Sequence, residues 1–155
     1  MSIVDYYLVR HGEAVAEMFD PLRPLSATGR EDAERVARLT AARNCRIAAI
    51  RHSGILRARQ TAEILAAHLN PAGGVQQISG LLPQDDPMVA KAELESALEP
   101  VMLVGHLPHI NRLAALLVLG DPDRTIVDFA PATLVCLSHD GLQWKMEWQL
   151  VPRSL

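Results

Sequence analysis

Hydrophobic positions along the chain alternate between short unbroken runs and longer stretches with helical spacing. Unbroken runs of four or so residues are typical of buried strands, and apolar residues three or four positions apart are typical of helices. Turn signals such as Asn70-Pro71 and Gly120 separate these segments. The pattern predicts strands over 6–9, 47–50, 75–78 and 101–104, and helices over 26–43, 56–69, 88–98 and 108–119.

From Thr133 onward the pattern changes to a period of two. Strands are expected over 134–137 and 144–150, joined by an Asp140-Gly141 turn that is typical of hairpins. Trp144 and Trp148 are expected on one face of the last strand, against the core. Together the segments predict a single α/β domain over 1–155, with three layers (α/β/α) and a mostly parallel sheet that ends in an antiparallel C-terminal edge hairpin.

Composition and charge narrow the class of protein. A chain of 155 residues can bury a core without help from metals or disulfides. Its 15 basic and 18 acidic residues give a net charge of -3, which disfavours binding to nucleic acid or to an acidic membrane. Cys45 and Cys136 have no C-x-x-C spacing, and neither a signal peptide nor a membrane-spanning stretch is evident. We therefore expect a cytoplasmic protein without a metal or cofactor.

Basic and imidazole side chains follow three of the predicted strands. Arg10 and His11 follow the first strand, Arg51-His52 follows the second and leads to Arg57, and His106 follows the strand over 101–104. Ligands of open α/β sheets bind at these carboxyl ends. Arginine forks suit phosphate oxygens, and histidine can add a hydrogen bond or a nucleophilic nitrogen. Since no aspartate cluster accompanies them to hold magnesium, the residues predict metal-free handling of a phosphoryl group.

Three motifs, in this order, resemble those of the histidine phosphatase superfamily, which includes the phosphoglycerate mutases. They are Arg10-His11-Gly12-Glu13, Ser53-Gly54-Ile55-Leu56-Arg57-Ala58-Arg59-Gln60-Thr61 and Val104-Gly105-His106. The short length and two further stretches resemble the bacterial phosphohistidine phosphatases of the SixA type; these stretches are Arg23-Pro24-Leu25-Ser26 and Gly105-His106-Leu107-Pro108. The resemblance implies a phosphoglycerate mutase-like fold.

The resemblance also implies a role for each matched residue. His11 would attack phosphorus and become a phosphohistidine, while Arg10, Arg57 and His106 would hold the phosphoryl oxygens. The carbonyl of Gly12 is expected to orient the His11 ring so that the other ring nitrogen attacks. The remaining residues expected to bind phosphate are Gly12, Arg23 and Leu107.

The sequence departs from the family in two places. Gly54 stands where the family usually has proline, which should loosen that turn but leave Arg57 in place. Gly80 stands where larger members often carry the glutamate that protonates an alkoxide leaving group. Because a phosphoramidate breaks a weaker bond to an easily protonated nitrogen, a missing acid favours phosphohistidine over a sugar phosphate. The candidate general acids that remain are Glu13, Asp85 and Asp86.

Three functions stay open from the sequence. The leading hypothesis is a phosphatase that acts on phosphohistidine in a protein, either a histidine phosphotransfer domain or a carrier. A phosphomonoesterase for a small phosphorylated metabolite would be favoured if Asp85 or Asp86 pointed into the site, or if 71–100 folded over it. A phosphate-binding module without turnover is disfavoured by the intact set of Arg10, His11, Arg57 and His106.

Overall fold

Strands buried on both faces form the centre of the structure, a computed structural model that describes residues 3–153. The strand order is β3-β2-β4-β1-β5-β6; the first four strands are parallel, and β5 and β6 are antiparallel at one edge. All the predicted elements are present in the predicted order, and the predicted fold class is confirmed. The elements are β1 Val4–Arg10, α1 Ala27–Ala42, β2 Ala49–His52, α2 Leu56–Leu69, β3 Val75–Gln77, α3 Pro87–Ser96, β4 Val101–Gly105, α4 His109–Leu119, β5 Leu134–His139 and β6 Trp144–Leu150.

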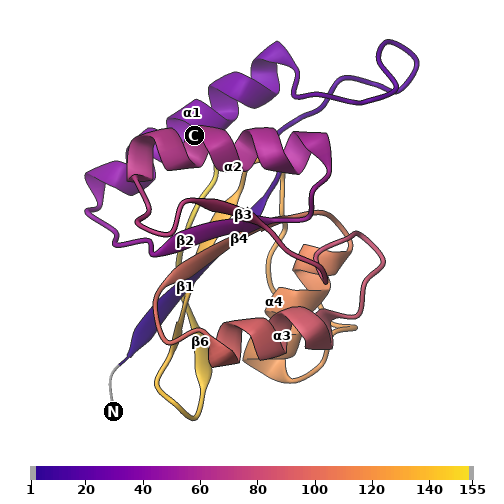
Figure 1. Cartoon of the computed structure of the whole chain (residues 1–155). Helices are drawn as coiled ribbons and strands as arrows, with labels where there is room; N and C mark the ends of the chain where they lie inside the picture. Colours follow the sequence, from indigo (N-terminus) through magenta and orange to yellow (C-terminus); the bar gives the residue numbers. More distant parts are fainter. Residues whose placement is uncertain (1–2, 154–155) are drawn as a thin grey trace.

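Helices cover both faces of the sheet and give three layers (Figure 1). Along β1, Tyr7 and Val9 pack into the core beneath α1 and α2, whereas Tyr6 and Leu8 pack into the core beneath α3 and α4. Successive side chains of a strand point to opposite faces, so a strand covered on both sides is hydrophobic at every position. Within 3–153, no helix combines the length and the apolar content needed to cross a membrane.

The second predicted strand is shifted by two residues. β2 covers Ala49–His52, so Arg51 and His52 lie inside the strand and not beyond its end. The reason is pairing: Arg51 aligns with Leu103 and His52 with Val104 of β4, which continues the parallel ladder past the apolar run. A strand between two partners can carry a polar residue because its backbone hydrogen bonds do not depend on the side chain.

The prediction that Trp144 and Trp148 share one face is wrong. Cys136 of β5 pairs with Trp148 while its neighbour Leu137 pairs with Met146, so one extra residue of β6 bulges between them. A bulge reverses the alternation of side chains along the strand. Trp144 therefore packs near Tyr6, with ring centroids 5.2 Å apart, and Trp148 packs on the opposite face.

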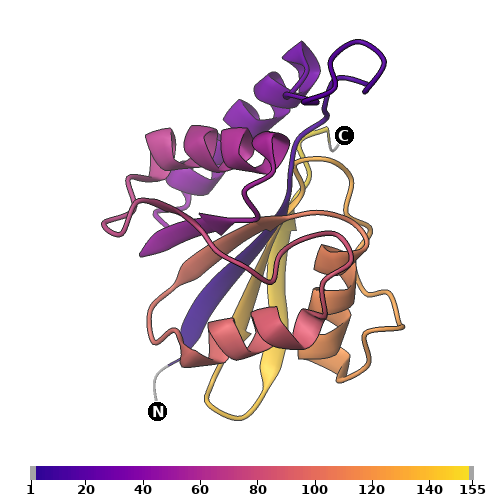
Figure 2. The same cartoon turned by 45° about the vertical axis from the view of Figure 1, so that its right-hand side comes forward.

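Parallel pairing brings the carboxyl ends of three strands together at one edge of the sheet. Arg10 at the end of β1 aligns with Gly105 at the end of β4, and His52 at the end of β2 aligns with Val104. The loop between β1 and α1 starts at this edge and projects from the body of the molecule (Figure 2). The residues that follow the three strands therefore meet in one place.

Candidate active site

Four side chains predicted to form the site converge at this edge. The backbone N–H of His11 donates to the carbonyl of Gly105 at 3.0 Å. This contact brings His11 beside His106, with ring centroids 5.0 Å apart. Arg57, the second residue of α2, directs its Nε at His11 Nε2 across 3.4 Å. Arg10 ends β1 directly before His11, and its charge acts on the pKa of both His11 and His106, so the four residues form one cluster.

The His11 ring is held with one nitrogen unprotonated. Its Nδ1 lies 2.7 Å from the Gly12 carbonyl oxygen, and because a carbonyl only accepts, Nδ1 carries the proton. Burial lowers the pKa of His11 to about 4, against the opposing effect of the Gly12 carbonyl. The positive charges of Arg57, Arg10 and Arg23 lower this pKa further. At pH 7 the ring is therefore neutral, and its unprotonated Nε2, which accepts from Arg57 Nε, needs no separate base to become a nucleophile.

His106 is more deeply buried than His11, with 1% of its surface exposed. Its Nε2 lies 2.7 Å from Ser53 Oγ. Burial, followed by the proximity of His11 and Arg57, lowers the pKa of His106 to about 3. A neutral imidazole can still donate one hydrogen bond to an anion. No local pattern predicts a role for Ser53, because its contact with His106 joins residues 53 positions apart.

Three guanidinium groups make the cluster positive. Arg10 Nη1 donates to the Phe129 carbonyl at 2.8 Å, while its Nε is buried and has no partner within 3–153. Burial lowers the pKa of both Arg10 and Arg57, although arginine stays charged at neutral pH. Arg23 Nε donates to the Val15 carbonyl at 3.1 Å, and its charge acts on Arg57, so it lies near the cluster. Buried donors without a partner favour an anionic ligand.

Gly12 is packed too closely for any side chain. A Cβ there would lie 2.8 Å from the carbonyl oxygen of Gly29 in α1. The Gly12 N–H donates to Thr61 Oγ1 at 3.1 Å, and that hydroxyl donates to the Arg57 carbonyl at 2.8 Å. Thr61 of the second motif thus ties the backbone beside His11 to α2, a link that the sequence pattern alone did not reveal.

Leu107 and Glu13 differ in their relation to the cluster. Leu107 directly follows His106 and is exposed at that edge of the sheet. The Glu13 side chain instead accepts a hydrogen bond from Ser26 Oγ at 3.0 Å. Ser26 is the N-cap residue of α1, so Glu13 fixes the entry into that helix.

Asp85 and Asp86 line a depression of about 650 Å³ beside the cluster. Asp85 Oδ2 accepts the N–H of Leu82, and Asp86 Oδ1 accepts the N–H of Met88 at the start of α3, each at 2.9 Å. Neither carboxylate forms a hydrogen bond to His11 or His106 in the described part of the chain. Ser53 is the boundary between the depression and the cluster. The other lining residues are Gln77, Ile78, Ser79, Gly80, Leu82 and Val89.

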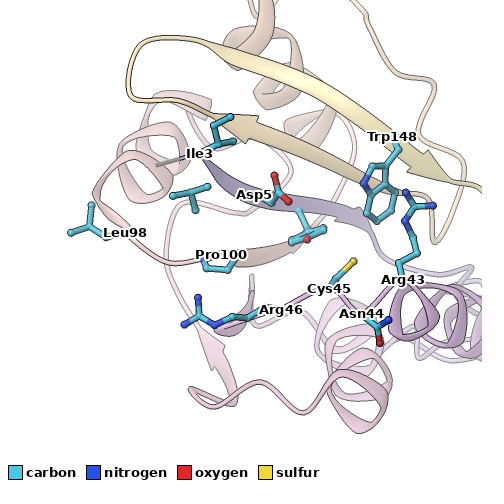
Figure 3. A pocket seen from close by; sticks show the side chains of 11 residues that line it. Ile3, Asp5, Arg43, Asn44, Cys45, Arg46, Leu98, Pro100 and Trp148 are labelled. Carbon is cyan, nitrogen blue, oxygen red and sulfur yellow. The ribbon is translucent and has the colours of Figure 1, made fainter. Parts of the chain in front are cut away.

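A second pocket, of about 550 Å³, lies at the opposite end of β1 (Figure 3). It is lined by Asp5, Cys45 and Trp148 among others, and the Arg43 guanidinium lies 3.9 Å above the Trp148 ring. None of the clustered arginines and histidines belongs to it. Across 3–153, no group of three or more His, Cys, Asp or Glu side chains is arranged to hold a metal.

Comparisons with known proteins point to one family. The family model of the histidine phosphatase superfamily (branch 1) matches residues 6–81, a range that includes the first and second motifs. The chain is 27% identical over 154 residues to phosphohistidine phosphatase SixA of Escherichia coli (strain K12), with 96% of this chain and 94% of that protein covered.

Solved structures show the same architecture. The structure of the protein histidine phosphatase SixA complexed with tungstate matches with a TM-score of 0.85 and 25% identity, covering 96% of this chain and 97% of that one. A phosphoglycerate mutase from Bacillus anthracis str. Sterne matches with a TM-score of 0.71 over 94% of this chain and 92% of its own, at 13% identity, which bears on the fold alone. The expected phosphoglycerate mutase-like fold is therefore confirmed. The motifs, the family model, the curated relative and the fold agree on the histidine phosphatase superfamily (branch 1), and they indicate a hydrolase.

Proposed function

We propose that this enzyme removes phosphoryl groups in two steps, through a phosphohistidine on His11. The hydrogen bond between His11 Nδ1 and the Gly12 carbonyl carries the proposal, because it leaves Nε2 as the unprotonated nitrogen of a neutral ring. In the first step Nε2 bonds to phosphorus while the bond from phosphorus to the leaving atom breaks. In the second step a water oxygen bonds to phosphorus, the nitrogen–phosphorus bond breaks, and phosphate leaves with His11 restored.

Arg10, Arg57 and His106 hold the phosphoryl oxygens during both steps. Guanidinium forks match the spacing of phosphate oxygens, and the buried Arg10 Nε has no protein partner within 3–153. The Arg57 Nε that donates to His11 Nε2 becomes free to bond an oxygen once Nε2 has bonded to phosphorus. Arg23 adds a third positive charge where negative charge builds up in the transition state. The border of the phosphate site is completed by Gly12 and Leu107.

The substrate that we propose is phosphohistidine in a protein, either a histidine phosphotransfer domain or a carrier. One oxygen of each candidate acid, Glu13, Asp85 and Asp86, accepts a hydrogen bond from a neighbouring group away from His11. A sugar phosphate needs such an acid for its alkoxide leaving group, whereas the leaving nitrogen of a phosphoramidate takes a proton from solvent. The name of the Escherichia coli relative, a phosphohistidine phosphatase, supports the same substrate class.

Exposed apolar side chains on the loop after β1 also favour a protein substrate. Met18, Phe19 and Leu22 are 83%, 78% and 71% exposed, and Arg23 follows them next to the cluster. The loop projects from the body of the molecule in both views (Figures 1 and 2). Apolar surface beside a site is typical of a surface that contacts another protein. We expect this loop to contact the phosphorylated partner. Separately, we propose that the reaction takes place in the cytoplasm.

The test compares two substrate classes without added metal. Purified protein is incubated with a phosphohistidine-bearing phosphotransfer domain and, separately, with a panel of sugar phosphates, and released phosphate is measured. Turnover of the phosphoprotein alone, abolished in His11→Ala, would support the proposal. His139→Ala is the matched control, because His139 pairs with Val4 at the far end of the sheet and should be dispensable. Phosphate binding without turnover, by both the wild type and His11→Ala, would indicate a binding module.

A small-molecule phosphomonoesterase is the second candidate. The depression beside Ser53 favours it, since Asp85 and Asp86 line a space where a leaving group could lie. Turnover of a sugar phosphate that is lost in Asp85→Asn or Asp86→Asn would establish this function and a proton donor. Asp140→Asn is the control, because Asp140 accepts the same kind of turn hydrogen bond, from Leu142 N–H, in the distant β5–β6 hairpin.

A further inference from the structure

The turn between β2 and α2 carries a buried hydroxyl to which the proposed reaction gives no role. Ser53 is 8% exposed, and its Oγ lies 2.7 Å from Nε2 of His106. The same oxygen accepts the backbone N–H of Ile55 at 3.2 Å. In the described part of the chain, His106 Nδ1 is buried without a hydrogen-bond partner, so the Ser53 hydroxyl is the one group that bonds this ring.

A neutral imidazole ring such as that of His106 needs a hydrogen-bond partner to decide whether it directs an N–H or a lone pair at a ligand. The proton of an imidazole can sit on either nitrogen, and the ring can turn over about its Cβ–Cγ bond. These states exchange an N–H for a lone pair at the same place. A phosphoryl oxygen bonds to the N–H but is repelled by the lone pair. With 1% of His106 exposed, solvent has little access to the ring, so the choice falls to the protein.

The turn also fixes the position of the hydroxyl. Gly54 has a φ of 93°, a conformation that favours glycine, and a Cβ there would lie 2.5 Å from Gln77 Nε2. The Gly54 N–H donates to His52 Nδ1 at 3.0 Å. A proline at position 54, the residue usual in the family, would lack this N–H. The hydrogen bond from Gly54 N–H to the His52 ring holds the backbone beside Ser53, and the bond from Ile55 N–H holds the Ser53 oxygen itself.

We propose that Ser53 is a positioning residue that holds His106 in one tautomer and one orientation toward the phosphoryl group. The inference rests on the proposed function, in which His106 bonds a phosphoryl oxygen. Ser53 acts through the ring of His106 and not on the reacting atoms. Ser53 should therefore affect the rate of the chemical step more than the binding of the phosphoprotein.

The experiment compares Ser53→Ala with Ser138→Ala. Ser138 is a matched control, because it is 6% exposed and its Oγ donates to Glu147 Oε1, also at 2.7 Å, away from the cluster. Nitrogen-15 chemical shifts of the His106 ring, assigned by their loss in His106→Asn, report the tautomer without any substrate. We expect two well-separated shifts in the wild type and in Ser138→Ala, and averaged shifts in Ser53→Ala. We also expect kcat on phosphohistidine to fall on the order of 10- to 100-fold in Ser53→Ala alone, with KM little changed.

Unchanged shifts and unchanged kcat in Ser53→Ala would overturn the proposal. If that variant does not fold, Ser53→Cys replaces it, since a thiol keeps nearly the same volume but donates and accepts weakly. Averaged shifts are then expected again, and wild-type shifts would overturn the proposal. A wild type without any phosphatase activity would refute the proposed function, whereas averaging in the Ser53 variant would still support Ser53 as the group that orients the ring.

Discussion

Replacing Arg57 with alanine removes the guanidinium whose Nε donates to His11 Nε2 across 3.4 Å. In the proposed mechanism the same guanidinium bonds a phosphoryl oxygen in the transition state. A hydrogen bond to a charged group contributes about 1.5 to 3 kcal/mol. The loss corresponds to a roughly 10- to 150-fold lower kcat/KM for the phosphoprotein.

The same substitution should move the pH profile. Burial first, and then the charge of Arg57 with those of Arg10 and Arg23, keep the pKa of His11 at about 4, so the neutral nucleophile persists in mild acid. Arg57→Ala admits water to the ring and removes a positive charge, and both changes raise this pKa. The acid limb of kcat/KM should therefore move to higher pH. Loss of an oxygen contact alone would lower the rate equally at every pH.

The assay measures initial rates of phosphate release from a phosphohistidine domain across the acid range, corrected for uncatalysed loss. Arg59→Ala is the control, because Arg59 lies on the same helix but its Nε bonds Glu63, one turn away, at 3.2 Å on the surface. Its rate and its acid limb should match the wild type. A normal rate in Arg57→Ala, or an acid limb that stays at the wild-type position, would refute the assignment of Arg57 beside the nucleophile.

Three further predictions concern stability, measured as the free energy of unfolding in urea. The pKa of His11 is about 4 in the folded protein and 6.5 in the unfolded chain. The stability that the neutral ring contributes is therefore present above pH 6.5 and is lost as the pH falls toward 4. Because of His11, the free energy of unfolding should fall by about 2 kcal/mol between pH 7 and pH 5, and in His11→Asn it should fall by correspondingly less. Thr61→Val leaves the Gly12 N–H without its acceptor and should cost about 1 to 3 kcal/mol; an unchanged value would contradict that bond. Gly12→Ala places a Cβ 2.8 Å from the Gly29 carbonyl and should cost about 1 to 3 kcal/mol, whereas full stability would mean that the packing is looser.

The proposed chemistry depends on two histidines that are both neutral. Burial keeps the pKa of His11 at about 4 and that of His106 at about 3. A neutral His11 can attack phosphorus. A neutral His106 adds a hydrogen bond without burying another positive charge beside the arginines. The positive charge of the site therefore comes from Arg10, Arg57 and Arg23. The histidines of such a site should add little pH dependence to phosphate binding near neutrality, beyond that of the phosphate itself.

The order of elements was predictable because each element has its own local pattern. Apolar runs such as Val101–Gly105 are buried on both faces, and α4 begins one residue after the predicted Pro108 and ends before Gly120 as predicted. Boundaries were less predictable. β2 extends through Arg51 and His52 because β4 continues to pair with it, and no local pattern contains that information.

The convergence of Arg10, His11, Arg57 and His106 was also predictable, because parallel strands that precede these residues must end at one edge of the sheet. Residue type and chain order were sufficient for that inference. The resemblance to a family added the expected role of each residue, and those roles stay predictions until the variants are measured.

By itself, the sequence determined the fold class and which residues meet at the carboxyl edge, since both follow from local periodicity and from the order of strands. Only the tertiary structure decided how those residues are oriented. The bulge in β6 that separates the two tryptophans, the Thr61 hydroxyl on Gly12 and the Ser53 hydroxyl on His106 each join or shift distant segments of the chain. A hydrogen bond between residues about 50 positions apart depends on the packing of whole elements, and local sequence patterns carry no record of it.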